Sequence, residues 1–257
     1  IANKNKIITF GSPHIIYLYY RDHGEMLGVV EGHEELFPYY MEMSGGCGVG
    51  FDYQIKAEYY LEKGNLNEAE IYAHKAIYKA RTLEQTSVII CSKLTLARIC
   101  AARGSFEQAQ EIMDQLSNEV DILNSSILSS SLDLSRGYIS GIIGDDESFS
   151  KWLKSGEIDS SEVLYQGMGF NYIVYGKYLL LKKEYIKLEI LCEEMQYVFK
   201  VFNNLLGYLH AYILEAIAKY RVYGMHKAKK SMLKAIEIGK YDNIILPFAE
   251  YSIHIEN

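Results

Sequence analysis

The chain has 257 residues, of which 49% are hydrophobic and 23% charged, and its formal net charge at pH 7 is −7. This composition suits an ordered, soluble protein. The acidic balance provides no basic face for phosphates, so we expect no nucleic-acid binding by this segment. The lysines near position 229 are interpreted as the solvated side of a helix.

We also expect no membrane association, because the chain has no signal peptide and no run of 18 apolar residues. The four cysteines show neither a disulfide-framework spacing nor paired CxxC motifs. A reducing cytoplasm fits this pattern. The first residue is Ile1, and we therefore expect the chain to be part of a longer protein.

Residues 1–50 are expected to form a helical lead-in that ends in a Gly-rich hinge. After an irregular start at residues 7–11, Ser12 is predicted to cap a short helix with Pro13 at its first position. A helix is expected over residues 25–43, where Pro38 either kinks it or begins a second segment. Four glycines between positions 44 and 50 indicate a hinge or, alternatively, a ligand-contacting loop; the Lys-Ser/Thr of a phosphate loop is absent.

A repeat dominates the rest of the chain. Gly64, Ala69 and Ala76 recur forty residues later as Gly104, Ala109 and, with a substitution, Leu116. Each copy predicts a helix, a turn on glycine and a second helix, and such hairpins stack because one alone cannot bury its apolar face. We predict an all-α fold, a right-handed superhelical solenoid over residues 51–257. Its hairpins are expected at about 51–83, 87–120, 123–160, 165–200 and 206–241, and a further helix begins at Pro247.

The two clear units resemble tetratricopeptide repeats, although their spacing is longer and the usual terminal proline is absent. Together with Thr9-Phe10-Gly11-Ser12-Pro13-His14, the Gly-rich stretch and Pro247-Phe248-Ala249-Glu250, they resemble the helical region of MalT-like, LuxR-type bacterial transcriptional regulators. Those proteins also carry a nucleotide-binding module and a DNA-binding helix-turn-helix, and neither pattern occurs here.

The resemblance implies a cytoplasmic signal-receiving (effector-binding) and oligomerisation region, without a cofactor, ATP-binding or DNA-binding module in this chain. Its expected partners are a small-molecule effector or a protein or peptide in the concave groove, together with self-association. The alternative is a tetratricopeptide scaffold that binds a protein partner.

Helical geometry selects the candidate binding residues, because one face of each hairpin's first helix should line the inner surface. Transferring that register between hairpins pairs Gln54 with Glu58, Leu94 with Arg98, Leu134 with Tyr138, Ile173 with Lys177, and His210 with Ile213. The predicted concave-face ligand-binding residues are Gln54, Glu58, Arg98, Tyr138, Lys177 and His210. The alternative is a Glu58–Arg98 salt bridge, worth at most about 1 kcal/mol if exposed.

No catalytic or metal site is expected. The seven histidines are scattered, without an HExxH motif or a zinc-ligand spacing. Asp145-Asp146-Glu147 lacks the spacing of a calcium loop. The 23 tyrosines are interpreted mainly as fillers between helices, with an aromatic surface for a sugar or peptide as the functional alternative. We therefore expect a protein that binds, not an enzyme.

Overall fold

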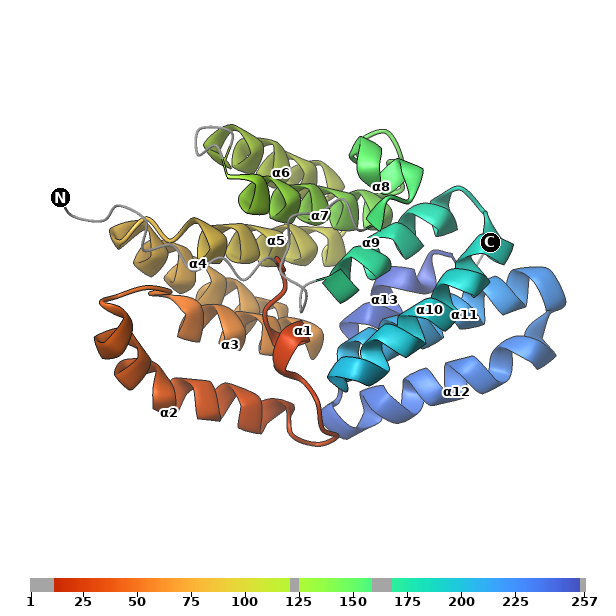
Figure 1. Ribbon diagram of the computed structural model, residues 1–257, viewed down its shortest axis with the longest axis horizontal. Helices are drawn as coiled ribbons and strands as arrows, with labels where there is room; N and C mark the ends of the chain where they lie inside the picture. Colours follow the sequence, from red (N-terminus) through yellow and green to blue (C-terminus); the bar gives the residue numbers. More distant parts are fainter. Residues whose placement is uncertain (1–11, 121–124, 159–167, 255–257) are drawn as a thin grey trace.

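The structure is a computed structural model that describes residues 12–120, 125–158 and 168–254. Helices are the only regular secondary structure in these residues, which contain no strand, and this confirms the all-α expectation for them (Figure 1). The expected irregular start at 7–11, the beginning of the third hairpin at 123 and the beginning of the fourth at 165 lie outside the described residues. The helices are α1 (Ile16–Tyr19), α2 (Met26–Ser44), α3 (Phe51–Glu62), α4 (Leu66–Thr82), α5 (Thr86–Ala102), α6 (Phe106–Val120), α7 (Ser126–Ile143), α8 (Lys151–Ser155), α9 (Met168–Leu181), α10 (Tyr185–Phe202), α11 (Leu205–Tyr223), α12 (Met225–Asp242) and α13 (Leu246–Ser252).

From α3 to α12, helices pack mainly against their neighbours in sequence. In addition, α3, α5, α7, α9 and α11 contact one another in that order, and we call this set the inner row. Each of α4, α6 and α10 packs against the two inner-row helices that flank it in the chain (Figure 1). Four alanines, one on each helix from α3 to α6, are fully buried: Ala57, Ala69, Ala97 and Ala109.

Residues in the left-handed region end the first helix of most hairpins. Gly64, Gly104 and Gly144 have φ values of 76°, 77° and 85°, a conformation that glycine adopts without a Cβ penalty. In the fourth hairpin Lys183 takes this place with φ 58°. The turn after α11 is made by Gly224. The turns expected from the glycine spacing are thus present.

The lead-in differs from the sequence expectation. The first helix has only four residues and begins at Ile16, so Ser12 does not cap it. Instead, the Ser12 hydroxyl accepts the N–H of His14 and donates to the carbonyl of His14. The next helix, α2, continues through Pro38 as one element.

The Gly-rich stretch forms a tight turn packed against α4. Gly45, Gly46, Gly48 and Gly50 all have positive φ, and the N–H of Gly48 donates to Gln85 Oε1 at 2.7 Å. A Cβ on Gly50 would lie 2.6 Å from the carbonyl oxygen of Ala76. Close approach to α4 therefore explains a glycine here, while hinge motion and ligand contact stay predictions.

Both terminal segments fold onto the inner row. Helix α1 contacts α3 and α11, and α13 contacts α3, α5 and α11 (Figure 1). The N–H of Ile245 donates to the carbonyl of Glu62 at 2.8 Å. The lead-in is also tied to the end of α12, because the hydroxyl of Tyr20 and the N–H of Met26 both donate to the Asp242 carboxylate. None of the described helices is long and apolar enough to cross a membrane.

Candidate binding site on the inner row

The six predicted binding residues lie on all five inner-row helices, and every one of them is buried. The exposed fraction is at most 4% for any of Gln54, Glu58, Arg98, Tyr138, Lys177 and His210. The expectation that they line an open groove is therefore wrong. The physical reason is that α1 and α13, which belong to no hairpin, cover this face of the row.

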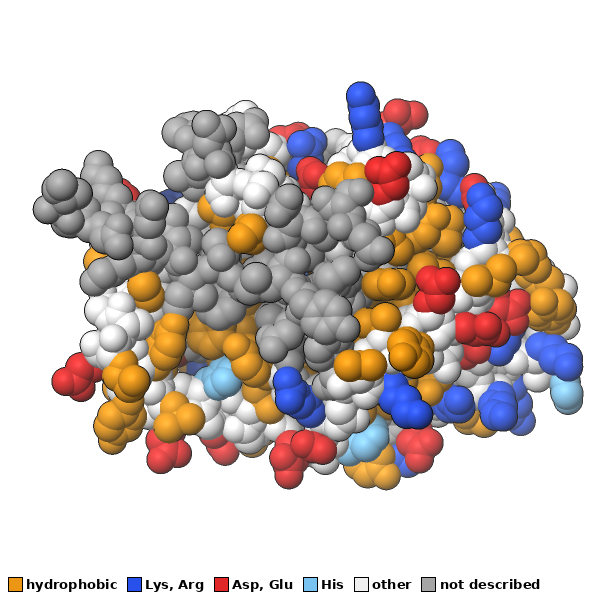
Figure 2. Space-filling view, viewed as in Figure 1, with side chains coloured by type: hydrophobic (Ala, Val, Ile, Leu, Met, Phe, Trp, Pro, Cys, Tyr) orange, Lys and Arg blue, Asp and Glu red, His pale blue; other side chains and the backbone are white. Residues whose placement is uncertain are grey.

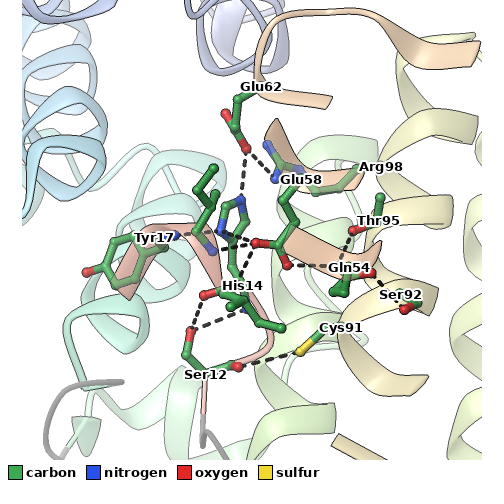
Figure 3. Close-up of polar contacts among 12 residues, drawn as sticks. Ser12, His14, Tyr17, Gln54, Glu58, Glu62, Cys91, Ser92, Thr95 and Arg98 are labelled. Carbon is green, nitrogen blue, oxygen red and sulfur yellow. Dashed lines mark hydrogen bonds and ion pairs between the residues drawn. The ribbon is translucent and has the colours of Figure 1, made fainter. Parts of the chain in front are cut away.

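On the α3 side, Glu58 holds the start of α1. One carboxylate oxygen accepts the N–H groups of Ile15 and Ile16 at 2.7 and 2.6 Å, and the other accepts from Gln54 Nε2 at 2.7 Å (Figure 3). The first N–H groups of a helix have no partner inside the helix. The capping role expected of Ser12 is thus performed by a carboxylate from α3. Gln54 also donates to Thr95 Oγ1 on α5 at 2.9 Å.

His14 links this segment to the next carboxylate on α3. Its Nδ1 accepts the N–H of Tyr17 at 3.3 Å, so Nε2 carries the proton that is donated to Glu62 Oε1 at 2.8 Å (Figure 3). Arg98 Nη1 donates to the same oxygen at 2.7 Å. Burial raises the pKa of Glu62, but Arg98 and His14 outweigh it and lower that pKa to about 2.

The alternative interpretation, a Glu58–Arg98 salt bridge, is also wrong, because Arg98 pairs with Glu62 and Glu250. Its Nη1 binds Glu62, one turn beyond Glu58 on the same face of α3, and its Nε donates to Glu250 Oε1 on α13 at 2.8 Å. Burial lowers the pKa of Arg98, but Glu250 and Glu62 together raise it well above the usual value. This guanidinium therefore joins α3, α5 and α13 as a permanent cation.

After Glu62, Glu250 is the second carboxylate on which buried polar groups converge. We call the whole set the buried polar cluster; it consists of His14, Gln54, Glu58, Glu62, Arg98, Tyr138, Lys177, His210, Glu250 and Tyr251. Its Oε2 accepts the Tyr138 hydroxyl at 2.6 Å and lies 3.9 Å from Lys177 Nζ. The Lys177 ammonium also lies over two aromatic rings, 4.4 Å from the centroid of Tyr138 and 4.0 Å from that of Tyr251. One carboxylate from α13 is thus surrounded by groups from α5, α7 and α9.

Lys177 is the least satisfied charge of the cluster. Within the described residues its Nζ donates no hydrogen bond, and its side chain is 1% exposed. Burial lowers the pKa of Lys177 to about 8; Glu250 offsets part of this shift, and Arg98 adds to it. Burial and Lys177 likewise hold the pKa of His210 well below its usual value, so this imidazole is neutral near pH 7 and its Nδ1 pairs with the Tyr251 hydroxyl at 3.0 Å.

Sequence reasoning missed four participants: His14, Glu62, Glu250 and Tyr251. Glu62 lies four residues after Glu58, so the helical register could have found it. The other three belong to α13 or to the segment before α1, and no repeat pattern extends to them. Their role depends on contacts across more than 40 residues of sequence.

The remaining sequence interpretations concern the surface and metal binding. Lys227, Lys229 and Lys230 are exposed on α12 as expected, and Figure 2 shows basic side chains along this helix. Among the described residues, no group of three or more His, Cys, Asp or Glu side chains is placed so that it could hold a metal ion. No protein-family model matches the chain, and the search of curated proteins found no match.

Proposed function

We propose that this chain is the signal-receiving and oligomerisation region of a MalT-like, LuxR-type transcriptional regulator. In this proposal it is a right-handed superhelical solenoid of tetratricopeptide-like hairpins that works in the cytoplasm. The observation that carries the proposal is the buried polar cluster, to which all five inner-row helices contribute.

The spacing of the repeats links this cluster to the hairpins. Carried forward by the repeat spacing, the position of Glu58 falls on Arg98, Tyr138 and Lys177, and these side chains are buried on consecutive helices of one row. Equivalent positions face the same way when hairpins stack with a constant rotation. The arrangement therefore supports a repeat architecture over an irregular helical bundle.

The cluster also supports a mechanism for receiving a signal. Helices α1 and α13 bridge α3 to α11, the first and last helices of the row. An effector that displaces either bridge would free the two ends of the row to change their relative position. It shifts the equilibrium only if it binds the two arrangements with different affinity. Assembly of the regulator would follow from that change.

A constitutive scaffold is the second candidate, and one surface favours it. An apolar pocket between α11 and α12 is lined by Ala216, Ile217, Tyr220, Met225, Ala228, Lys229, Met232 and Leu233. Met225 and Leu233 are more than half exposed there. Exposed apolar surface of this kind is typical of contact sites for protein partners.

The two functions are separated by two experiments. First, the coding sequence on both sides of this segment should contain a Gly-rich loop with Lys-Ser/Thr upstream and a helix-turn-helix downstream. Second, a metabolite panel should raise the melting temperature of the chain and alter its scattering profile. The regulator would be refuted in favour of the scaffold if the flanking sequence contained neither module. The same conclusion would follow if a polypeptide bound the chain stoichiometrically while no metabolite had an effect.

A further inference from the structure

The surroundings of Glu250 have the composition of a carboxylate-binding site. A guanidinium N–H, a phenol hydroxyl and an ammonium converge on its two oxygens from three different inner-row helices. All three donor side chains are 1% exposed. Charge-assisted hydrogen bonds in such buried surroundings are among the strongest that proteins make.

The donors exceed what Glu250 uses. Within the described residues Arg98 Nη2 and Lys177 Nζ have no hydrogen-bond partner although both are buried. Leaving a buried charged donor unpaired costs free energy. A carboxylate that can sit closer to Lys177 than the 3.9 Å of Glu250 would satisfy the site better than the chain's own side chain does.

The walls of the site are aromatic. The Tyr138 ring stacks on Phe170 with centroids 5.4 Å apart and an interplanar angle of 12°. The Tyr251 ring, from α13 itself, lies beside Lys177 and makes an edge contact with His210. α13 therefore places a carboxylate and an aromatic ring in the site together. A ligand that combines these two groups would make the same contacts.

α13 is suited to detach from its place on the inner row. It has seven residues, too few for a helix that is stable without its packing partners. It follows Asn243, which has φ 55°, and so begins just after a left-handed residue that ends α12. Its buried face consists of Leu246, Pro247, Glu250 and Tyr251, with two of these four side chains in the polar cluster.

We propose that Arg98, Tyr138 and Lys177 form a binding site for a small aromatic carboxylic acid, which α13 occupies through Glu250 and vacates when the acid binds. This inference rests on the proposed function and names the chemical class of its effector. The ligand carboxylate takes the place of the Glu250 carboxylate, and its ring takes the place of the Tyr251 ring.

The test compares the wild-type chain with Glu250→Ala, which removes the competing carboxylate. The probes are 3-phenylpropionate, acetate and the uncharged 3-phenylpropionamide, with binding measured by calorimetry and by melting temperature. We expect 3-phenylpropionate to bind the variant saturably and at least tenfold more tightly than it binds the wild type. The variant should also bind 3-phenylpropionate at least tenfold more tightly than it binds the amide. Glu237→Ala, on the exposed side of α12, should behave as the wild type.

Two further measurements keep the inference refutable if Glu250→Ala does not fold. Glu250→Gln keeps the side-chain shape and should show the same order of affinities. In the wild type, saturating 3-phenylpropionate should speed amide hydrogen exchange in α13 several-fold. The inference is overturned if carboxylate and amide bind alike, if a peptide of residues 244–254 binds but the free acids do not, or if exchange in α13 stays unchanged.

The two hypotheses can fail separately. Flanking sequence without regulator modules would refute the proposed function but leave the binding of an aromatic acid to this site measurable. Conversely, a genuine regulator region whose Glu250 variants gain no carboxylate affinity would refute only the identity of the ligand. A second change, Lys177→Met in the Glu250→Ala background, should lower the affinity for 3-phenylpropionate about tenfold.

Discussion

Replacing Lys177 with methionine should stabilise the protein near neutral pH. The ammonium is buried without a hydrogen bond among the described residues, and the pKa of Lys177 is lowered from 10.5 to about 8. This gap corresponds to about 3 kcal/mol by which the folded state disfavours the charged form. Methionine has a similar length and no charge, so Lys177→Met should remove most of this cost at pH 7.

The sign of the pH dependence follows from the same shift. Between pH 8 and 10.5 the unfolded chain still holds the Lys177 proton, while the folded chain has released it. The unfolded state therefore binds more protons, and the contribution of Lys177 to stability rises with pH. The advantage of Lys177→Met should be largest at or below pH 7 and shrink steadily above pH 8.

Urea unfolding of both proteins at pH 7, 8, 9 and 9.5 measures this difference, and the subtraction removes other groups that titrate in the range. Lys227→Met, at an exposed position on α12, is the matched control and should change stability by less than about 0.5 kcal/mol. A Lys177→Met variant that is less stable at pH 7, or whose advantage is independent of pH, would refute the reasoning.

The remaining predictions concern the same cluster and the Gly-rich turn. Arg98→Met should lower the free energy of unfolding by about 3–5 kcal/mol, because it strands two buried carboxylates; a loss below 1 kcal/mol in urea unfolding would contradict this. The pKa of Glu62 is lowered to about 2, so its contribution to the free energy of unfolding is present above about pH 4.5 and disappears towards pH 2. The difference in stability between the wild type and Glu62→Gln, followed by acid titration, should shrink over the same range. Gly50→Ala places a Cβ 2.6 Å from the Ala76 carbonyl oxygen and should lower the free energy of unfolding by more than about 2 kcal/mol. The Cβ of Gly64→Ala meets nothing within 4 Å, so this variant should lose only about 1 kcal/mol, for its positive φ. Equal shifts in the melting temperature of the two variants would refute the distinction.

The sequence made the helices and the inward-facing positions predictable, because both are periodic. The glycine spacing located the turns after α3 and α5, and the register transfer identified Arg98 and Lys177 as inward-facing. Local patterns could not show that Glu250 would pair with both, since the segment that carries it lies outside the repeats. The same reason explains the error at Ser12: its local capping pattern is sound, but Glu58, 46 residues away, satisfies the N–H groups at the start of α1.

The tie between the lead-in and α12 bears on how the protein unfolds. Stacked hairpins that touch only their neighbours can melt one after another from an end. Here the Tyr20 hydroxyl and the Met26 N–H donate to Asp242, more than 200 residues along the chain, so the lead-in and the end of α12 cannot separate without breaking these hydrogen bonds. This contact couples the lead-in to α12 and therefore favours a single cooperative unfolding transition. Folding should be slow, because the two sides of the contact are so distant in sequence.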